Sequence, residues 1–108
     1  MTGILVMDPK FPLGQLVWTR AVNERIANIA EFAAFVLVAL QRHAHADWGD
    51  MDAEDKQSND EALAAGDLRI FSSYKLPESL AAESPDKQVW VITEADHSVT
   101  TVLFPSDY

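Results

Sequence analysis

Apolar residues are densest in residues 29–40, where Glu31 is the single charged side chain. The segment has no Gly or Pro and is rich in Ala and Leu, which favour a helix. A helix that is apolar on every side must be buried on most of its faces, so we expect it at the centre of the domain. It is shorter than the roughly 20 apolar residues that cross a bilayer. We predict a central helix that continues to His43 or His45.

Residues 20–27 are predicted to form a short helix before the central one. Thr19 precedes it, and a threonine hydroxyl can accept a hydrogen bond from a free N–H of the first turn. Asn28 and Glu31 have the spacing of a capping box, which would begin the central helix. The sequence leaves open whether the two helices are separate or form one kinked rod.

Residues 52–65 are predicted to form a third helix. They are good helix formers, and Gly66 suits the left-handed position that often follows a helix end. Few of these residues are apolar. We therefore expect this helix to lie on the surface.

Three segments in the second half of the chain have the β-branched and alternating pattern of strands. They are residues 68–76, 88–95 and 99–104. A turn at residues 96–98 makes the last two a hairpin. Residues 77–87 contain two prolines and are expected to be a connecting loop. Residues 15–18 fit either a strand or the start of a helix.

These elements predict one domain, residues 1–108, of the α+β class. N-terminal helices surround the apolar central helix, which packs on a three- to four-stranded antiparallel sheet with a C-terminal β-hairpin. An isolated hairpin is marginally stable, so the central helix must cover one face of the sheet.

The chain has 17 acidic and 8 basic residues, a net charge of −9, and no cysteine. Disulfides and thiolate metal sites are therefore excluded. Direct nucleic-acid binding is not expected, because nucleic-acid binders carry a basic patch. The apolar run at residues 4–7 is too short for a secretory signal. We expect a cytoplasmic protein that binds neither a membrane nor a cofactor.

Most of the negative charge lies between residues 47 and 67, where Lys56 is the only basic residue. The acidic side chains are Asp47, Asp50, Asp52, Glu54, Asp55, Asp60, Glu61 and Asp67. Such a surface would attract the basic surface of a protein or nucleoprotein complex and compete with DNA for it. The alternative is a solvated helix face that only aids solubility.

A second set of residues offers ligand chemistry at two turns. It comprises His43, Trp48, Glu94, Asp96 and His97. His43, His45 and Asp47 imitate part of a zinc motif, but positions i and i+2 of a helix do not face each other. Cationic residues also suit a helix C-terminus, which explains the histidines without a metal. We therefore predict no metal site and no catalytic residue.

Several motifs are spread over most of the chain. They are FPLGQ at 11–15, His43 before DWGD at 47–50, DK, N and AL within 55–63, SSY at 72–74, WVITEADHSVTT at 90–101 and FPSDY at 104–108. With these motifs the chain resembles a family of small bacterial proteins carried on plasmids, integrative elements and prophages and often labelled plasmid-related. His97 stands where that family usually has Arg, and residues 21–40 do not follow its pattern.

The resemblance implies an accessory protein of a mobile genetic element. Combined with the acidic segment, it favours a non-enzymatic interaction protein, such as an inhibitor of a CRISPR or restriction complex. Two alternatives stay open. One is a small enzyme or ligand-binding domain that uses the two turns, and the other is a module that forms a homodimer through the apolar helix at residues 29–40.

Overall fold

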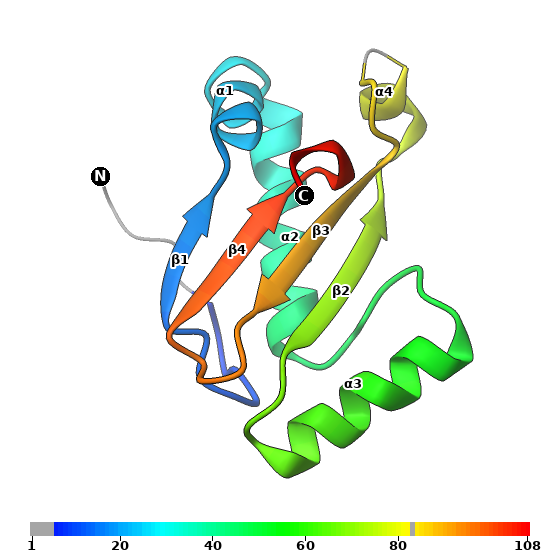
Figure 1. Cartoon of the computed structure of the whole chain (residues 1–108). Coiled ribbons are helices and arrows are strands. Elements are labelled where there is room, and N and C mark those ends of the chain that lie inside the picture. Colours follow the sequence, from blue (N-terminus) through cyan, green and yellow to red (C-terminus); the bar gives the residue numbers. More distant parts are fainter. Residues whose placement is uncertain (1–5, 83) are drawn as a thin grey trace.

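The computed structural model, which describes residues 6–82 and 84–108, has helices packed on one face of a four-stranded sheet (Figure 1). The strands are β1 (Gln15–Trp18), β2 (Ile70–Lys75), β3 (Gln88–Thr93) and β4 (Val99–Leu103), in the spatial order β1-β4-β3-β2. The helices are α1 (Arg20–Asn28), α2 (Ala30–Ala44), α3 (Ala53–Ala65), α4 (Glu78–Ala81) and the 3-10 turn η1 (Pro105–Asp107). The predicted α+β class is confirmed.

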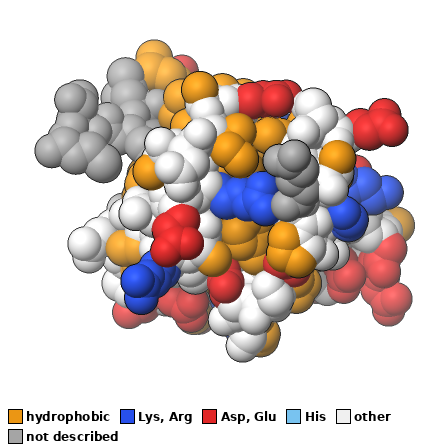
Figure 2. Space-filling view, turned by 90° about the horizontal axis from the view of Figure 1, so that it is seen from above, with side chains coloured by type: hydrophobic (Ala, Val, Ile, Leu, Met, Phe, Trp, Pro, Cys, Tyr) orange, Lys and Arg blue, Asp and Glu red, His pale blue; other side chains and the backbone are white. Residues whose placement is uncertain are grey.

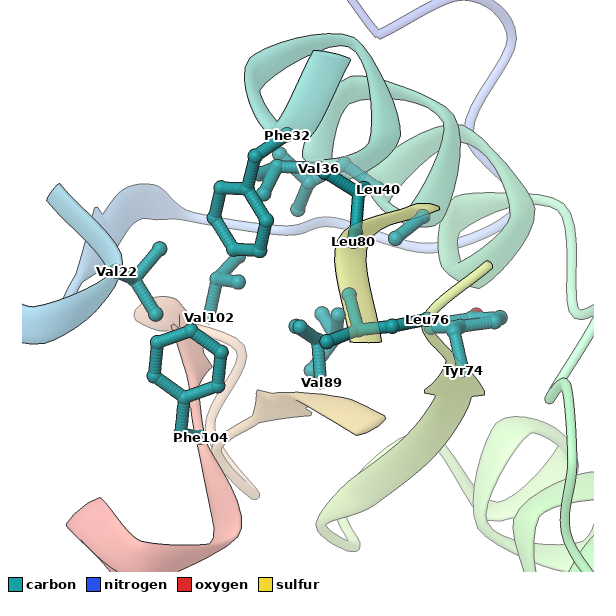
Figure 3. Close-up of a cluster of buried hydrophobic side chains, with 12 residues drawn as sticks. Val22, Phe32, Val36, Leu40, Tyr74, Leu76, Leu80, Val89, Val102 and Phe104 are labelled. Carbon is teal, nitrogen blue, oxygen red and sulfur yellow. The ribbon is translucent and has the colours of Figure 1, made fainter. Parts of the chain in front are cut away.

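α2 covers the sheet as predicted, and α1 lies beside it on the same face (Figure 1). Phe32, Val36 and Leu40 recur at helical spacing along α2 and are buried. They meet Tyr74 of β2 and the valines of β3 and β4 in the core shown in Figure 3. Successive side chains of a strand point to opposite faces of the sheet, so every second strand residue points toward α2 and is buried by it.

The expectation that α2 is buried on most of its faces holds for most of its residues but is wrong for one side of the helix. Leu37 and Val38 are 41% and 56% exposed, and Ala30 and Ala34 on the same side are also exposed. The sheet covers only one side of this helix, because the described residues place no second layer over the other side (Figure 1). α2 therefore presents an apolar outer stripe.

The predicted capping box at Asn28 and Glu31 is also wrong. Asn28 ends α1, and its side-chain amide donates to the carbonyl oxygen of Glu24 at 2.8 Å. The Glu31 carboxylate instead accepts from the Ser79 hydroxyl at 2.6 Å. Extended backbone at Ile29 separates α1 from α2, so they are two helices rather than one rod.

Residues 15–18 form a strand, which settles the question that the sequence left open. β1 pairs in parallel with β4, with Gln15 opposite Val99, whereas the other strand pairs are antiparallel. The sheet is thus mixed and not wholly antiparallel. The predicted loop at residues 77–87 contains the short helix α4, which begins after Pro77.

The N-terminal apolar run at residues 4–7 falls partly on residues 4 and 5, which lie outside the described residues. None of the described helices has the length and apolar character that crossing a bilayer requires.

Candidate functional site

The first residues of the acidic segment, residues 47–67, cover the outer edge of β2. Ser73 N donates to Trp48 O at 3.2 Å, and Asp50 N donates to Ser73 O at 2.7 Å. The Asp50 carboxylate accepts from Lys75 N at 2.8 Å. An edge strand otherwise presents free N–H and C=O groups to other chains, so this segment protects the sheet.

α3 is attached to the same edge. Asn59 is buried and bonds to the backbone of Phe71 through both atoms of its amide. The indole N–H of Trp48 donates to Asp60 at 2.9 Å. α3 therefore lies against β2, at one side of the molecule, and leaves most of its side chains in solvent (Figure 1).

The predicted acidic residues are all exposed, but they divide into two groups. Asp47, Asp50, Asp52 and Asp60 are engaged in the fold. The Arg42 guanidinium bonds to Asp47 at 2.7 Å and lowers the pKa of that carboxyl. Asp52 caps α3 by accepting from Asp55 N at 2.8 Å.

The second group consists of Glu54, Asp55, Glu61 and Asp67. Glu61 accepts one long bond from Gln57 at 3.4 Å. None of the four carboxylates pairs with a cation among the described residues. Residues 6–82 and 84–108 contain no group of three or more His, Cys, Asp or Glu that could hold a metal ion. We call this group the negative surface.

His43 lies in the core and not at a solvated helix end, so the interpretation as a helix-end cation is wrong for it. Its Nδ1 is 2.6 Å from the Ser72 hydroxyl and its Nε2 is 2.9 Å from the Thr93 hydroxyl. Thr93 is 2.7 Å from the Thr100 hydroxyl, which donates to Leu13 O at 2.6 Å. The result is one buried chain of hydrogen bonds that ends on a backbone carbonyl.

The carbonyl fixes the direction of this chain, because it can only accept. Thr100 uses its proton on Leu13 O, so Thr93 must donate to Thr100 and His43 Nε2–H must donate to Thr93. The Nδ1 atom then accepts from Ser72. Burial lowers the pKa of His43 to about 3, which keeps the ring neutral at pH 7. A buried ring with both nitrogens bonded is unavailable to a ligand in solvent.

The other ligand candidates are only partly brought together. Phe11 lies against the rings of His43, Trp48 and His97, with centroid distances of 5.4, 6.3 and 5.8 Å. The space among these rings is therefore occupied by Phe11.

The two acidic candidates, Glu94 and Asp96, interact with other residues. Glu94 pairs with Arg69 at 3.9 Å, and Asp96 accepts from Ser98 N at 3.0 Å.

A cavity of about 330 Å³ lies at the opposite end of the sheet, where β4 ends and β3 begins. Figure 2 shows this end of the molecule, with hydrophobic side chains between charged ones. Ile29, Pro85 and Phe104 line the cavity together with Glu24 and Asp86. Glu24 pairs with Arg20, and Asp86 accepts from Ser106, so these carboxylates are already bonded. None of the predicted ligand residues lines this cavity.

Sequence reasoning missed a group of rings on the face of the sheet that α1 and α2 leave open (Figure 1). The Phe71 and Trp90 rings are 4.9 Å apart, and the Trp90 and Tyr108 rings are 5.8 Å apart. The Arg69 guanidinium lies 5.5 Å from the centroid of the Tyr108 ring and donates to its hydroxyl at 3.0 Å. The signal was present in β3, whose residues are apolar on both faces.

No protein-family model matches the chain, and comparison with curated proteins and with solved structures found no match. The function must therefore be argued from these surfaces.

Proposed function

We propose that this chain is a non-enzymatic acidic interaction protein of a mobile genetic element, acting in the cytoplasm on the basic surface of a protein or nucleoprotein complex. The negative surface of Glu54, Asp55, Glu61 and Asp67 carries this proposal. Its carboxylates are exposed on and just after a helix anchored at one edge of the sheet, and none of them forms an ion pair among the described residues. The motif resemblance supports the mobile-element setting, in which inhibition of a CRISPR or restriction complex is the specific activity that we propose.

The anchoring of α3 supports a binding role for physical reasons. Its contacts with Phe71 and Trp48 hold the backbone, while Asp52 and Gly66 define the two helix ends. The carboxylates are therefore presented in a fixed arrangement before any partner arrives. Fixed charge of one sign steers a partner of opposite charge and raises the association rate.

The test compares two triple variants that remove equal charge. Glu54→Gln, Glu61→Gln and Asp67→Asn remove three of the four charges of the negative surface without touching the engaged carboxylates. Asp8→Asn, Glu24→Gln and Glu78→Gln serve as the matched control on other parts of the surface. Each protein is expressed in bacteria with an active CRISPR or restriction system, and survival of an incoming unmodified phage is measured.

The wild type and the control triple should raise phage survival, and the α3 triple should lose most of the effect. The complex with the inhibited protein should also weaken as salt rises, because exposed charges are screened. Equal protection by both triples, or binding that is insensitive to salt, would reject the acidic surface as the site of action.

The outer stripe of α2 favours one alternative, a module that pairs with a second copy of itself. Leu37 and Val38 are large apolar side chains left in solvent. Sedimentation at high protein concentration tests this alternative. A dimer that Leu37→Glu or Val38→Glu dissociates would support it, and a monomer at all concentrations would remove it.

A further inference from the structure

The open face of the sheet carries side chains of the kind that dominate binding energy at protein interfaces. Trp, Tyr and Arg are enriched at such positions. Here Trp90 and Phe71 are half-buried, Tyr108 is 71% exposed, and Arg69 lies against the Tyr108 ring. Leu68, next to Arg69 in the chain, is 51% exposed. We call Arg69, Phe71, Trp90 and Tyr108 the aromatic face.

The aromatic face adjoins the acidic helix. Asn59 of α3 bonds to the backbone of Phe71, whose ring contacts Trp90. The chain also runs directly from the end of α3 through Gly66 and Asp67 into Arg69. The acidic helix and the aromatic face therefore come from neighbouring elements, because α3 lies beside β2 (Figure 1).

We propose that the aromatic face docks a basic segment of the partner protein, with an arginine side chain stacked on the rings while neighbouring cations face α3. This proposal rests on the proposed function and specifies the chemistry of the partner. Charge complementarity selects a basic occupant, because α3 supplies negative charge beside the rings. A guanidinium is attracted to the face of an aromatic ring and stacks on it better than an ammonium. The contact between Arg69 and Tyr108 is an internal example of the same pairing.

The two surfaces would then have separate roles. The carboxylates of α3 attract a basic segment over several ångströms and accelerate its encounter. The rings provide short-range contact area, which slows dissociation once the segment is seated. Removing a ring should therefore weaken binding of arginine more than binding of lysine, whereas removing carboxylates should weaken both.

The experiment uses the full chain and two synthetic peptides, nona-arginine and nona-lysine, and follows binding by NMR. The Trp90 indole N–H is assigned with the variant Trp90→Phe. We expect nona-arginine to shift the Trp90 indole together with amides of α3, and to bind more tightly than nona-lysine. Tyr108→Ala should weaken nona-arginine binding by roughly two- to fivefold and leave nona-lysine binding nearly unchanged. Tyr108→Phe, which keeps the ring, should bind as the wild type does.

Other outcomes overturn the proposal in distinguishable ways. Shifts confined to α3, with no effect of Tyr108→Ala, would reject the aromatic face while leaving the acidic proposal standing. Failure of both peptides to bind would count against the proposed function as well. Binding of a twelve-nucleotide oligothymidine at Trp90 would make nucleic acid the occupant, since rings on a sheet also stack bases. Changes in the Trp90 NMR signal that depend on protein concentration alone would make a second copy of the protein the occupant. Unchanged thermal unfolding of Tyr108→Ala confirms that the fold is retained.

Discussion

Asn59 occupies the place that a neighbouring strand would take beside Phe71. Its Nδ2 donates to Phe71 O at 2.5 Å, and Phe71 N donates to its Oδ1 at 3.1 Å. We expect Asn59→Ala to lower the free energy of unfolding by about 1–3 kcal/mol, because two backbone groups lose their partner. The freed edge of β2 should also promote aggregation. Urea denaturation and light scattering measure the two effects.

Ser58→Ala is the control for this substitution. Ser58 is the preceding residue of α3, is exposed, and only donates to Glu54 O within its own helix. Its replacement should leave stability and solubility close to those of the wild type. Equal behaviour of the Asn59 and Ser58 variants would show that the side-chain amide does not protect the edge.

Thr100→Val should destabilise the protein, whereas Thr101→Val should be nearly neutral. The two threonines are adjacent in β4, but Thr100 lies in the core and Thr101 on the open face. Loss of the Thr100 hydroxyl removes the donor to Leu13 O and leaves the Thr93 hydroxyl without an acceptor for its proton, which costs about 1–3 kcal/mol. Chemical denaturation of both variants tests this, and equal losses would contradict the hydrogen-bond chain.

His43 should make stability depend on pH. Its pKa falls from 6.5 to about 3 on folding, so the unfolded chain binds a proton in a range where the folded chain does not. The free energy of unfolding is therefore unaffected by His43 protonation above pH 6.5. It decreases as the pH falls from 6.5 toward 3, by up to about 1.4 kcal/mol per pH unit. Urea denaturation between pH 7.5 and 5 measures the slope.

His43→Gln should remove this slope, although it lowers stability at every pH. His45→Gln, which replaces an exposed histidine two residues away, should keep the wild-type slope. The NMR signals of the His43 ring should also show the Nε2–H form throughout this range. A His43 ring that titrates near pH 6.5 would rule out the buried neutral state.

Gly49→Ala should be far more damaging than Gly66→Ala, although both glycines have positive φ angles, +78° and +80°. A Cβ at Gly49 would lie 2.0 Å from Ser73 O and 2.5 Å from the Tyr74 ring, whereas one at Gly66 meets nothing within 4 Å. We expect Gly66→Ala to cost about 1–2 kcal/mol for backbone strain alone. Gly49→Ala should cost about 4 kcal/mol or more, because it displaces the segment that covers β2. Thermal unfolding of the two variants decides this.

Local patterns predicted the parts of the fold that local chemistry determines. Asp52 and Gly66 end α3 as expected, since capping and a left-handed C-terminal residue involve only neighbouring groups. Thr19 caps α1 for the same reason, and the β3–β4 hairpin depends on a short turn. These elements need no information from distant parts of the chain.

Features that depend on distant contacts could not be predicted. The parallel pairing of β1 with β4 joins segments far apart in the sequence, and no local pattern specifies strand direction. The apolar run of α2 indicated burial, but which side the sheet would cover depends on the whole packing. His43 looked like a helix-end residue because its partners, Ser72 and Thr93, are remote in sequence.

The candidate site was predicted in composition but not in arrangement. The count of acidic residues located the negative charge at residues 47–67, yet only the structure distinguishes the four carboxylates that serve the fold from the four of the negative surface. The aromatic face escaped notice because Phe71, Trp90 and Tyr108 come from three separate segments.

The pairing of β1 with β4 has a consequence during synthesis on the ribosome. β1 is made early, but its neighbour in the described sheet is β4, the last strand along the chain. α1 and α2 consequently leave the exit tunnel before the surface that shields Phe32 and Leu40 exists. Nascent chains should therefore bind chaperones through α2 until β4 has left the exit tunnel, and ribosome profiling with captured trigger-type chaperones would show occupancy that persists past the codons of β4.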